Sequence, residues 1–302
     1  MVARVSTAID VRANGVRFSV LEEGEGDRLA LCLHGFPELG YSWRHQLPLL
    51  ARLGYRAWAP DLRGYGRSER PPRTADYAIE TLIDDAAGLI ERGGGRATLI
   101  AHDWGAIIAW YLAMRRPELL ERLVIMNVPH PAVLARELRN PRQLLKLSYA
   151  AVFQLPRLPE RLLAADHHRR IDNAFLSTAV DPARFTDADL REYREAARQP
   201  GALTAMLAYY RAYVRGGGMR RQRKLGLPII EVPTLMVWGE RDAFLSKETT
   251  LGTSAWVRDL TVRYLPDAAH WVQQEAPEAV NAILEAWLKG AKKVPEAWEI
   301  ST

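Results

Sequence analysis

The stretch ATLIAHDWGAIIAWYLAMR, residues 97–115, joins an apolar run, a short polar turn and a run with helical spacing. Its first part predicts a strand buried on both faces, and its last part predicts a helix. At the turn, Asp103 has a small residue two positions before it, Ala101, and another two positions after it, Gly105. A sharp strand-to-helix turn needs small neighbours, because its apex residue is strained and its flanks are crowded. The stretch therefore predicts an α/β fold that displays Asp103 at the carboxyl end of a strand.

Short apolar runs alternate with helix-like stretches along most of the chain. Each run is bounded by Gly, Pro or Asp, as expected for strands of a parallel sheet that is covered on both faces. The predicted strands are 29–33, 56–59, 97–101, 123–126, 233–238 and 261–265, and the predicted helices are 43–53, 79–91, 106–115 and 277–288. Two earlier strands, 9–12 and 16–20, flank Asn14-Gly15, a strong signal for a tight hairpin turn. The pattern predicts a mostly parallel, doubly wound sheet with helices on both faces.

The alternation stops between about 131 and 227, where the chain has helical periods, many Arg and Glu, and no convincing strand. An inserted helical cap or lid is the simplest explanation. It should cover the carboxyl ends of the strands, because open α/β sheets bind their ligands there. We therefore expect a first core part at 1–131, the cap at 132–226 and a second core part at 227–302.

Composition and charge exclude several classes of function. The chain has 302 residues, of which 48% are hydrophobic and 25% charged, as in ordinary globular proteins. No apolar run is long enough to span a bilayer, and residues 1–10 lack the apolar core of a signal peptide, so we expect a cytoplasmic protein. Cys32 is the only cysteine, which rules out an internal disulfide, and we expect no metal and no cofactor. The net charge is +5, but the basic cluster at 220–224 lacks aromatic residues, so we expect no nucleic-acid partner. The sequence leaves open whether the protein forms a homodimer.

Two further polar residues follow predicted strands, in positions that suit catalysis. Asp242 comes shortly after the strand 233–238, and His270 shortly after the strand 261–265. Because the carboxyl ends of parallel strands meet at one edge of a sheet, both should lie near Asp103. An isolated Asp or His in a loop is more often a turn or surface residue. However, Asp103, Asp242 and His270 follow the chain order nucleophile, acid, base of the α/β hydrolases. The apex residue here is Asp, and the motif G-x-S-x-G of the serine hydrolases does not occur.

An earlier glycine-rich turn, His34-Gly35-Phe36-Pro37, follows the predicted strand 29–33. Such a turn can point the backbone N–H of Phe36 into the same crevice. The N–H of Trp104, directly after the apex, is the second candidate donor to an oxyanion. We interpret His34 itself as a structural residue that holds the turn.

The whole chain resembles the epoxide hydrolase branch of the α/β-hydrolase fold family. The resemblance rests on His34-Gly35-Phe36-Pro37, Asp61-Leu62-Arg63-Gly64-Tyr65-Gly66-Arg67-Ser68, His102-Asp103-Trp104-Gly105 and Val128-Pro129-His130-Pro131. It implies hydrolysis of a small-molecule epoxide by water, with two ring-opening tyrosines in the cap. Tyr149 matches the first of these tyrosines. Tyr210 matches the second, with Tyr209 and Tyr213 as neighbouring alternatives.

These residues suit a covalent mechanism. Asp103 is already charged at neutral pH and can attack carbon without a base, leaving an ester on the protein. His270 would then activate water to hydrolyse this ester, while Asp242 fixes the imidazole tautomer. An opened epoxide leaves an alkoxide that needs a proton, and a tyrosine is both neutral and acidic enough to supply it. The tyrosine pair therefore favours an epoxide over a halide.

Alternative functions stay open. A haloalkane dehalogenase would use the same triad, and Trp104 would suit halide binding, but that family usually carries Asn where Phe36 stands. A fluoroacetate dehalogenase would have Arg directly after the nucleophile, and a carboxylesterase would have serine at the apex. A non-enzymatic receptor could keep the triad and bind a small ligand in the same pocket, and a turnover assay separates it from an enzyme.

Overall fold

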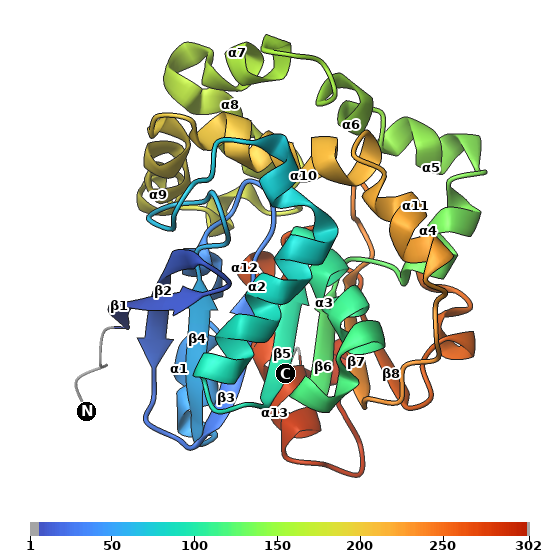
Figure 1. The fold of residues 1–302 in the computed structure, drawn as a ribbon. Coiled ribbons are helices and arrows are strands. Elements are labelled where there is room, and N and C mark those ends of the chain that lie inside the picture. The colour runs from blue at the N-terminus through green and yellow to red at the C-terminus, as the bar shows by residue number, and fades with distance from the viewer. Residues whose placement is uncertain (1–5, 301–302) are drawn as a thin grey trace.

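The computed structural model describes residues 6–300, and within them an eight-stranded sheet lies between helices on both faces (Figure 1). The strand order is β1-β2-β4-β3-β5-β6-β7-β8. The strands are β1 (Thr7–Ala13), β2 (Val16–Glu23), β3 (Arg28–Leu33), β4 (Tyr55–Pro60), β5 (Ala97–His102), β6 (Leu120–Met126), β7 (Thr234–Gly239) and β8 (Leu260–Leu265). Strands β3 to β8 pair in parallel, whereas β1 and β2 are antiparallel. The predicted α/β fold is confirmed.

The hairpin at the edge of the sheet forms around the predicted turn. Asn14 and Gly15 both have positive φ angles, 45° and 76°, as a two-residue hairpin turn requires. The register places Ala13 opposite Val16, so the strands begin directly on either side of the turn.

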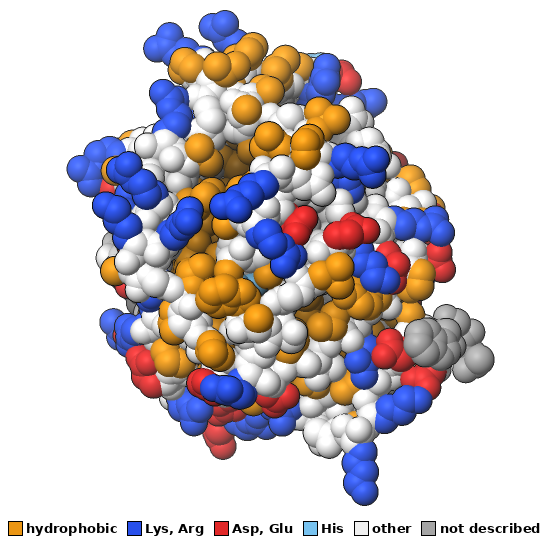
Figure 2. All heavy atoms as spheres, turned by 90° about the vertical axis from the view of Figure 1, so that its right-hand side faces the viewer, with side chains coloured by type: hydrophobic (Ala, Val, Ile, Leu, Met, Phe, Trp, Pro, Cys, Tyr) orange, Lys and Arg blue, Asp and Glu red, His pale blue; other side chains and the backbone are white. Residues whose placement is uncertain are grey.

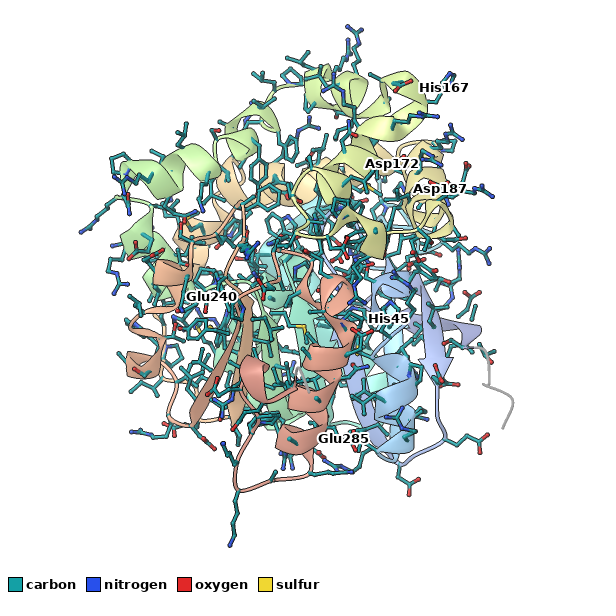
Figure 3. All side chains as sticks on the ribbon, turned by 180° about the vertical axis from the view of Figure 1, so that it is seen from behind. His45, His167, Asp172, Asp187, Glu240 and Glu285 are labelled. Atoms are coloured by element: carbon teal, nitrogen blue, oxygen red, sulfur yellow. The ribbon has the colours of Figure 1, made fainter. Side chains whose placement is uncertain are left out.

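The two faces of the sheet carry separate clusters of buried apolar side chains. Helices α2 (Ile79–Arg92) and α3 (Trp104–Arg115) pack on one face. Helices α1 (Leu47–Arg52) and α13 (Pro277–Leu288) cover the other, which faces the viewer in Figure 3. The short helices α12 (Val272–Glu275) and α14 (Ala297–Ile300) complete the second part of the core. Because both faces are covered, all six residues of β5 are buried, and its sequence is a nearly continuous apolar run.

The predicted helix 43–53 is longer than the helix in the structure. A short 3-10 helix covers Gly40–Trp43, and α1 begins only at Leu47. Pro48 lies in the first turn of α1, where a missing backbone N–H costs nothing, whereas the middle of a helix would lose a hydrogen bond there. Apolar spacing continues upstream of Pro48, so periodicity alone predicted too early a start.

Between β6 and β7 the described residues form helices and no strand. These are α4 (Pro131–Glu137), α5 (Pro141–Lys146), α6 (Tyr149–Val152), α7 (Leu158–Ala164), α8 (Arg169–Leu176), α9 (Asp187–Arg198), α10 (Ala202–Val214) and α11 (Gly218–Lys224). We call residues 131–224 the helical segment. It lies over the carboxyl ends of the strands (Figure 1), and β6 pairs directly with β7 across it. Its role as a separate cap at 132–226 stays a prediction.

The surface of the helical segment mixes apolar and basic side chains. Figure 2 shows groups of hydrophobic side chains between Lys and Arg on the upper part of this face. The large exposed apolar residues of the segment include Leu144, Leu145, Val152, Leu155 and Leu158. No helix in residues 6–300 is long and apolar enough to cross a bilayer.

Candidate active site

Asp103 lies at the turn between β5 and α3, as predicted. Its backbone angles, φ 48° and ψ −121°, are strained for a residue with a side chain. Neighbouring backbone approaches this turn closely, since a Cβ on Gly105 would lie 2.3 Å from the carbonyl oxygen of Leu33. A Cβ on Gly35 would lie 2.1 Å from Asp103 Oδ1. The two glycines therefore leave the space in which this strained residue can project its carboxylate.

The Asp103 carboxylate contacts one of the two predicted oxyanion donors. The backbone N–H of Phe36 donates to Asp103 Oδ1 at 2.6 Å. Trp104 is the first residue of α3, where backbone N–H groups have no partner within the helix. Burial opposes the charge of Asp103, but the hydrogen bonding and charge of His270 and the Phe36 N–H outweigh it and lower the pKa of Asp103. Asp103 is therefore ionised at neutral pH.

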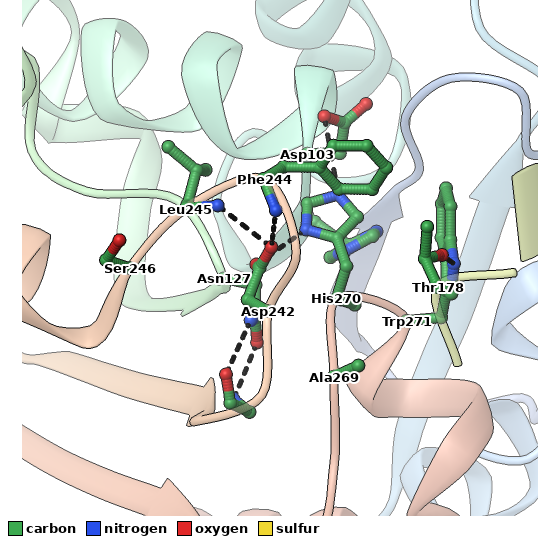
Figure 4. Close-up of polar contacts among 12 residues, drawn as sticks. Asp103, Asn127, Thr178, Asp242, Phe244, Leu245, Ser246, Ala269, His270 and Trp271 are labelled. Carbon is green, nitrogen blue, oxygen red and sulfur yellow. Dashed lines mark hydrogen bonds and ion pairs between the residues drawn. The ribbon is translucent and has the colours of Figure 1, made fainter. Parts of the chain in front are cut away.

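His270 lies between two carboxylates. Its Nδ1 is 2.8 Å from Asp242 Oδ2, and its Nε2 is 3.7 Å from Asp103 Oδ2 (Figure 4). Burial alone would lower the pKa of His270, but the two carboxylates more than compensate and raise it to about 10. The imidazole is therefore positively charged at neutral pH as long as Asp103 is ionised.

Asp242 follows β7 and is surrounded by hydrogen-bond donors. Its Oδ1 accepts from the N–H groups of Phe244 at 2.7 Å and Leu245 at 2.9 Å. Its Oδ2 accepts from Asn127 Nδ2 at 2.8 Å in addition to the bond with His270. Burial raises the pKa of Asp242, but the charge of His270 and these hydrogen bonds lower it below the usual value. The carboxylate is thus fixed in both position and charge.

Asn127 is a residue of this site that the sequence analysis missed. It directly follows β6, and its Oδ1 accepts from the N–H of Gly239 at 2.9 Å while its Nδ2 reaches Asp242. Its φ angle is 49°, a left-handed conformation that Asn tolerates better than most residues. The available signal was a polar side chain directly after the predicted strand 123–126.

A second buried network, also missed, supports the backbone around the site. His102 lies between two acceptors, with Nδ1 2.8 Å from Glu38 Oε2 and Nε2 2.8 Å from the carbonyl oxygen of His270. Glu38 also accepts from the N–H of Gly35 at 3.1 Å. Burial opposes the charge of Glu38, but its interaction with His102 and the hydrogen bond from the Gly35 N–H lower the pKa of Glu38. The pair thereby connects the turn before Phe36, the strand before Asp103 and the loop of His270.

His34 has the structural role that we expected. Its Nε2 accepts from the backbone N–H of Leu62 at 3.0 Å, and the side chain is fully buried. Burial lowers the pKa of His34 more than the nearby carboxylates raise it, so the ring stays neutral and can accept this bond.

The structure brings the two predicted tyrosines together. Tyr149 begins α6 and Tyr210 lies on α10, and their ring centroids are 6.2 Å apart. Burial, followed by nearby ionisable groups that include Asp103, raises the pKa of both phenols. Both are therefore neutral hydroxyl donors at neutral pH.

The alternatives to Tyr210 are engaged elsewhere. The hydroxyl of Tyr209 donates to the carbonyl oxygen of Arg63 at 2.8 Å. The hydroxyl of Tyr213 pairs with that of Tyr111 at 2.8 Å. Among these three residues of α10, Tyr210 is the one that shares a cavity with Asp103.

A cavity of about 330 Å³ lies over Asp103. Its walls include His270, Tyr149 and Tyr210, together with apolar side chains such as Phe153. In the described part of the chain, no group of three or more His, Cys, Asp or Glu residues is arranged to hold a metal ion. The site therefore combines a carboxylate, an imidazole and two phenols around a mostly apolar space.

Comparisons with known sequences and structures agree on one family. A sequence profile described as alpha/beta hydrolase fold matches residues 31–277. The AB hydrolase superfamily protein YfhM of Bacillus subtilis (strain 168) is 41% identical, over 92% of this chain and 96% of its own. Epoxide hydrolase 4 of Mus musculus is 36% identical, over 93% of this chain and 79% of its own. The crystal structure of Bacillus megaterium epoxide hydrolase in complex with an inhibitor is similar with a TM-score of 0.86 and 31% identity, over 93% of this chain and 100% of that one.

Proposed function

This chain belongs to the α/β-hydrolase fold family and, within it, to the epoxide hydrolases, and from that premise we propose that it forms a diol through a covalent ester on Asp103. Asp103 is the nucleophile, His270 the base and Asp242 the acid that orients it. The observation that carries the proposal is the shared cavity, in which Tyr149 and Tyr210 line the same space as Asp103 and His270. Because both tyrosines come from the helical segment, this segment acts as the cap.

In the first step, Asp103 Oδ2 attacks a carbon of the epoxide, and the bond between that carbon and the ring oxygen breaks. Oδ1 already accepts the Phe36 N–H, so Oδ2 is the oxygen that is free to attack. The ring oxygen keeps the electron pair of the broken bond and takes a proton from Tyr149 or Tyr210, which regains a proton from solvent.

Ester formation prepares His270 for the second step. An ester carries no charge, so Asp103 no longer stabilises the imidazolium. The pKa of His270 falls, and Nε2 releases its proton to solvent. Neutral Nε2 then takes a proton from water while the resulting hydroxide attacks the carbonyl carbon of Asp103. The Phe36 and Trp104 N–H groups stabilise the tetrahedral oxyanion. Its collapse breaks the ester bond, and the departing diol oxygen takes the proton from His270. The carboxylic acid left on Asp103 then gives its proton to neutral His270, which restores the carboxylate and the imidazolium.

A trapping experiment tests this assignment. The His270→Gln variant should still be alkylated by styrene oxide but should not hydrolyse the ester, so mass spectrometry should show protein plus one substrate. Asp103→Asn is the control and should form no adduct. An adduct of equal yield on Asp103→Asn would show that another residue is the nucleophile.

Turnover by the unmodified protein separates the alternatives. We expect diol from styrene oxide and no chloride from a chloroalkane of similar size. Chloride release without diol formation would assign a dehalogenase instead. Binding of both compounds without any product would assign a receptor.

A further inference from the structure

Exposed apolar side chains gather in one part of the helical segment. Of the ten large apolar residues that are exposed within 6–300, six lie between positions 144 and 162. These six, which we call the leucine patch, are Leu144, Leu145, Val152, Leu155, Leu158 and Leu162, each 40–74% exposed. Single exposed apolar side chains are ordinary, whereas a group of them indicates a surface that contacts a partner.

The leucine patch lies on the outer side of the helical segment and adjoins the cavity over Asp103. Helices α5, α6 and α7 follow one another along the outer edge of the segment, away from the sheet, when seen from the front and from behind (Figure 1, Figure 3). Leu162 of the patch also lines the cavity, as do Tyr149 and Phe153 at the two ends of α6. The same stretch of chain therefore borders the cavity and presents the patch to solvent.

The positive charge of the chain is concentrated around the leucine patch. Residues 139–170 contain seven Lys or Arg and only two Asp or Glu, an excess that equals the net charge of +5 of the whole chain. Six of these basic residues are exposed, namely Arg139, Arg142, Arg157, Arg161, Arg169 and Arg170. One of the two acidic residues, Glu160, forms an ion pair with Arg211 of α10. The rest of the chain is balanced in charge, so an anionic partner is attracted to this surface.

The combination of exposed leucines and arginines selects the kind of partner. A second copy of the chain would bring the same positive charges face to face in a twofold contact, which is unfavourable. A purely acidic macromolecule would pair with the arginines but would leave the leucines without an apolar counterpart. An anionic bilayer offers both, because its charged headgroups lie directly above hydrocarbon.

We propose that the leucine patch docks the protein peripherally on the surface of a bilayer that contains anionic phospholipids. The leucines enter the boundary between headgroups and acyl chains, and the surrounding arginines bind the headgroup phosphates. The attachment involves one leaflet, in agreement with the lack of a membrane-spanning helix in residues 6–300. Docking does not depend on the reaction proposed above, but it brings the cavity over Asp103 next to the lipid.

Co-sedimentation with vesicles tests the proposal on the whole protein. Vesicles of phosphatidylcholine alone are compared with vesicles of an equal mixture of phosphatidylcholine and phosphatidylglycerol. The mixed vesicles should bind the protein, and the neutral vesicles should bind far less, because they lack the charge that attracts the arginines. Added salt should weaken binding to the mixed vesicles, since these charges are open to solvent.

A serine variant tests the apolar part of the contact. Leu145 is the most exposed member of the patch, at 74%, and Leu145→Ser should weaken binding to the mixed vesicles about tenfold, because less apolar surface leaves water. Ile229→Ser is the matched control, since Ile229 is 46% exposed but lies outside the helical segment. It should bind as the unmodified protein does. Denaturant unfolding checks that both variants are folded.

Two pairs of arginines test the ionic part. Arg142→Gln combined with Arg161→Gln should weaken binding about thirtyfold, or about fivefold for each charge near the lipid. The control combines Arg52→Gln with Arg92→Gln, which lowers the net charge by the same amount. These two exposed residues end α1 and α2, each shortly before a strand begins, and so lie at the opposite end of the sheet from the helical segment. The control should bind almost normally.

Several results would overturn the proposal. Failure to sediment with either kind of vesicle, or equal binding to both, would show that no anionic bilayer is recognised. Equal losses in the two arginine pairs would assign binding to net charge, and unchanged binding by Leu145→Ser would assign it to ionic adsorption alone. A dimer in analytical ultracentrifugation that Leu145→Ser dissociates would assign the patch to a second copy. Turnover of styrene oxide without vesicles is measured separately, so failure of the proposed function would not be mistaken for failure of docking.

Discussion

Asp103 Oδ2 lies 3.7 Å from His270 Nε2. At this distance the charge of each residue affects the protonation of the other. Each favours the ionised form of the other, so the free protein holds a carboxylate and an imidazolium. In the proposed mechanism, the first chemical step needs the carboxylate, and the second needs a neutral imidazole. Formation of the ester would supply the change, because it would remove the charge that keeps His270 protonated.

Asp103→Asn should therefore lower the pKa of His270 from its value of about 10, because the neutral amide imitates the uncharged ester. Nuclear magnetic resonance of the imidazole nitrogens during a pH titration measures this shift. His130 serves as the control: burial lowers its pKa to about 4, and the ring should titrate at the same pH in both proteins. An unchanged His270 titration would contradict the coupling.

The same coupling predicts how stability depends on pH. The pKa of His270 is raised from an unfolded value of 6.5 to about 10. Its contribution to the free energy of unfolding is therefore fully present below pH 6.5 and is lost as the pH rises through about 10. Denaturant unfolding of the unmodified protein should show this loss on the alkaline side. In His270→Gln the alkaline loss should be smaller.

In the proposed mechanism, the two tyrosines of the helical segment should share the ring oxygen. Tyr149→Phe or Tyr210→Phe alone should slow alkylation about ten- to a hundredfold, as expected for one lost hydrogen bond to developing charge of about 1.5–3 kcal/mol. The double variant should lose far more, because no proton donor remains. Rapid-mixing kinetics of ester formation measure the step. Tyr213→Phe is the control, and near-normal alkylation in the double variant would contradict the roles.

At the scale of single residues, the sequence alone identified part of the site. Asp103, Asp242 and His270 each follow a predicted strand, so a simple rule about strand ends placed them together. Tyr149 and Tyr210 came from the family resemblance, since composition could not select them among the 11 tyrosines. Residues such as Asn127 and Glu38 act through partners far along the chain, and local patterns carry no information about those partners.

At the scale of elements, Asn127 links the ends of β6 and β7. Asn127→Ala should leave the Gly239 N–H unpaired and remove one donor to Asp242, at a cost of about 1–3 kcal/mol in the free energy of unfolding. Ester hydrolysis should slow more than alkylation, because Asp242 acts through His270. Denaturant unfolding and single-turnover kinetics measure the two effects. Equal slowing of both steps would show a merely structural role.

Apolar runs predicted both ends of most core strands to within about one residue, namely those of β3, β4, β5, β7 and β8, for a physical reason. A strand such as β5 is buried on both faces, so its ends coincide with the ends of an apolar run. The start of α1 depends on Pro48 and on the preceding 3-10 turn, which apolar spacing does not show. The arrangement of α4 to α11 over the sheet depends on contacts between distant residues and was expected only as a helical insertion.

At the scale of the whole molecule, a polar network joins the helical segment to the core. The hydroxyl of Tyr193 on α9 donates to Gln274 Oε1 at 2.6 Å, next to the loop of His270. Asp189 on the same helix forms an ion pair with Arg44 at 3.0 Å and accepts from Tyr41 at 2.9 Å. The network therefore holds α9 of the helical segment against the core near the loop of His270.

Tyr193→Phe should loosen this contact. The lost hydrogen bond should cost about 0.5–1.5 kcal/mol in the free energy of unfolding, and amide hydrogen exchange should become faster in Asp187–Arg198 than in the sheet. Tyr55→Phe removes a hydroxyl that bonds Arg28 within the core and is the matched control. Faster exchange in α9 of the control would contradict the role of the network. Unchanged exchange in α9 of Tyr193→Phe would contradict it as well.

The covalent ester on Asp103 is the central claim, and a single turnover in oxygen-18 water tests it most directly. Enzyme is held in excess over styrene oxide, and both the diol and the peptide that contains Asp103 are examined by mass spectrometry. Because water attacks the carbonyl carbon of the ester, the label should enter the Asp103 carboxylate, and the first diol should carry none. Label in that first diol, with an unlabelled Asp103, would show direct attack of water on the epoxide and contradict the mechanism.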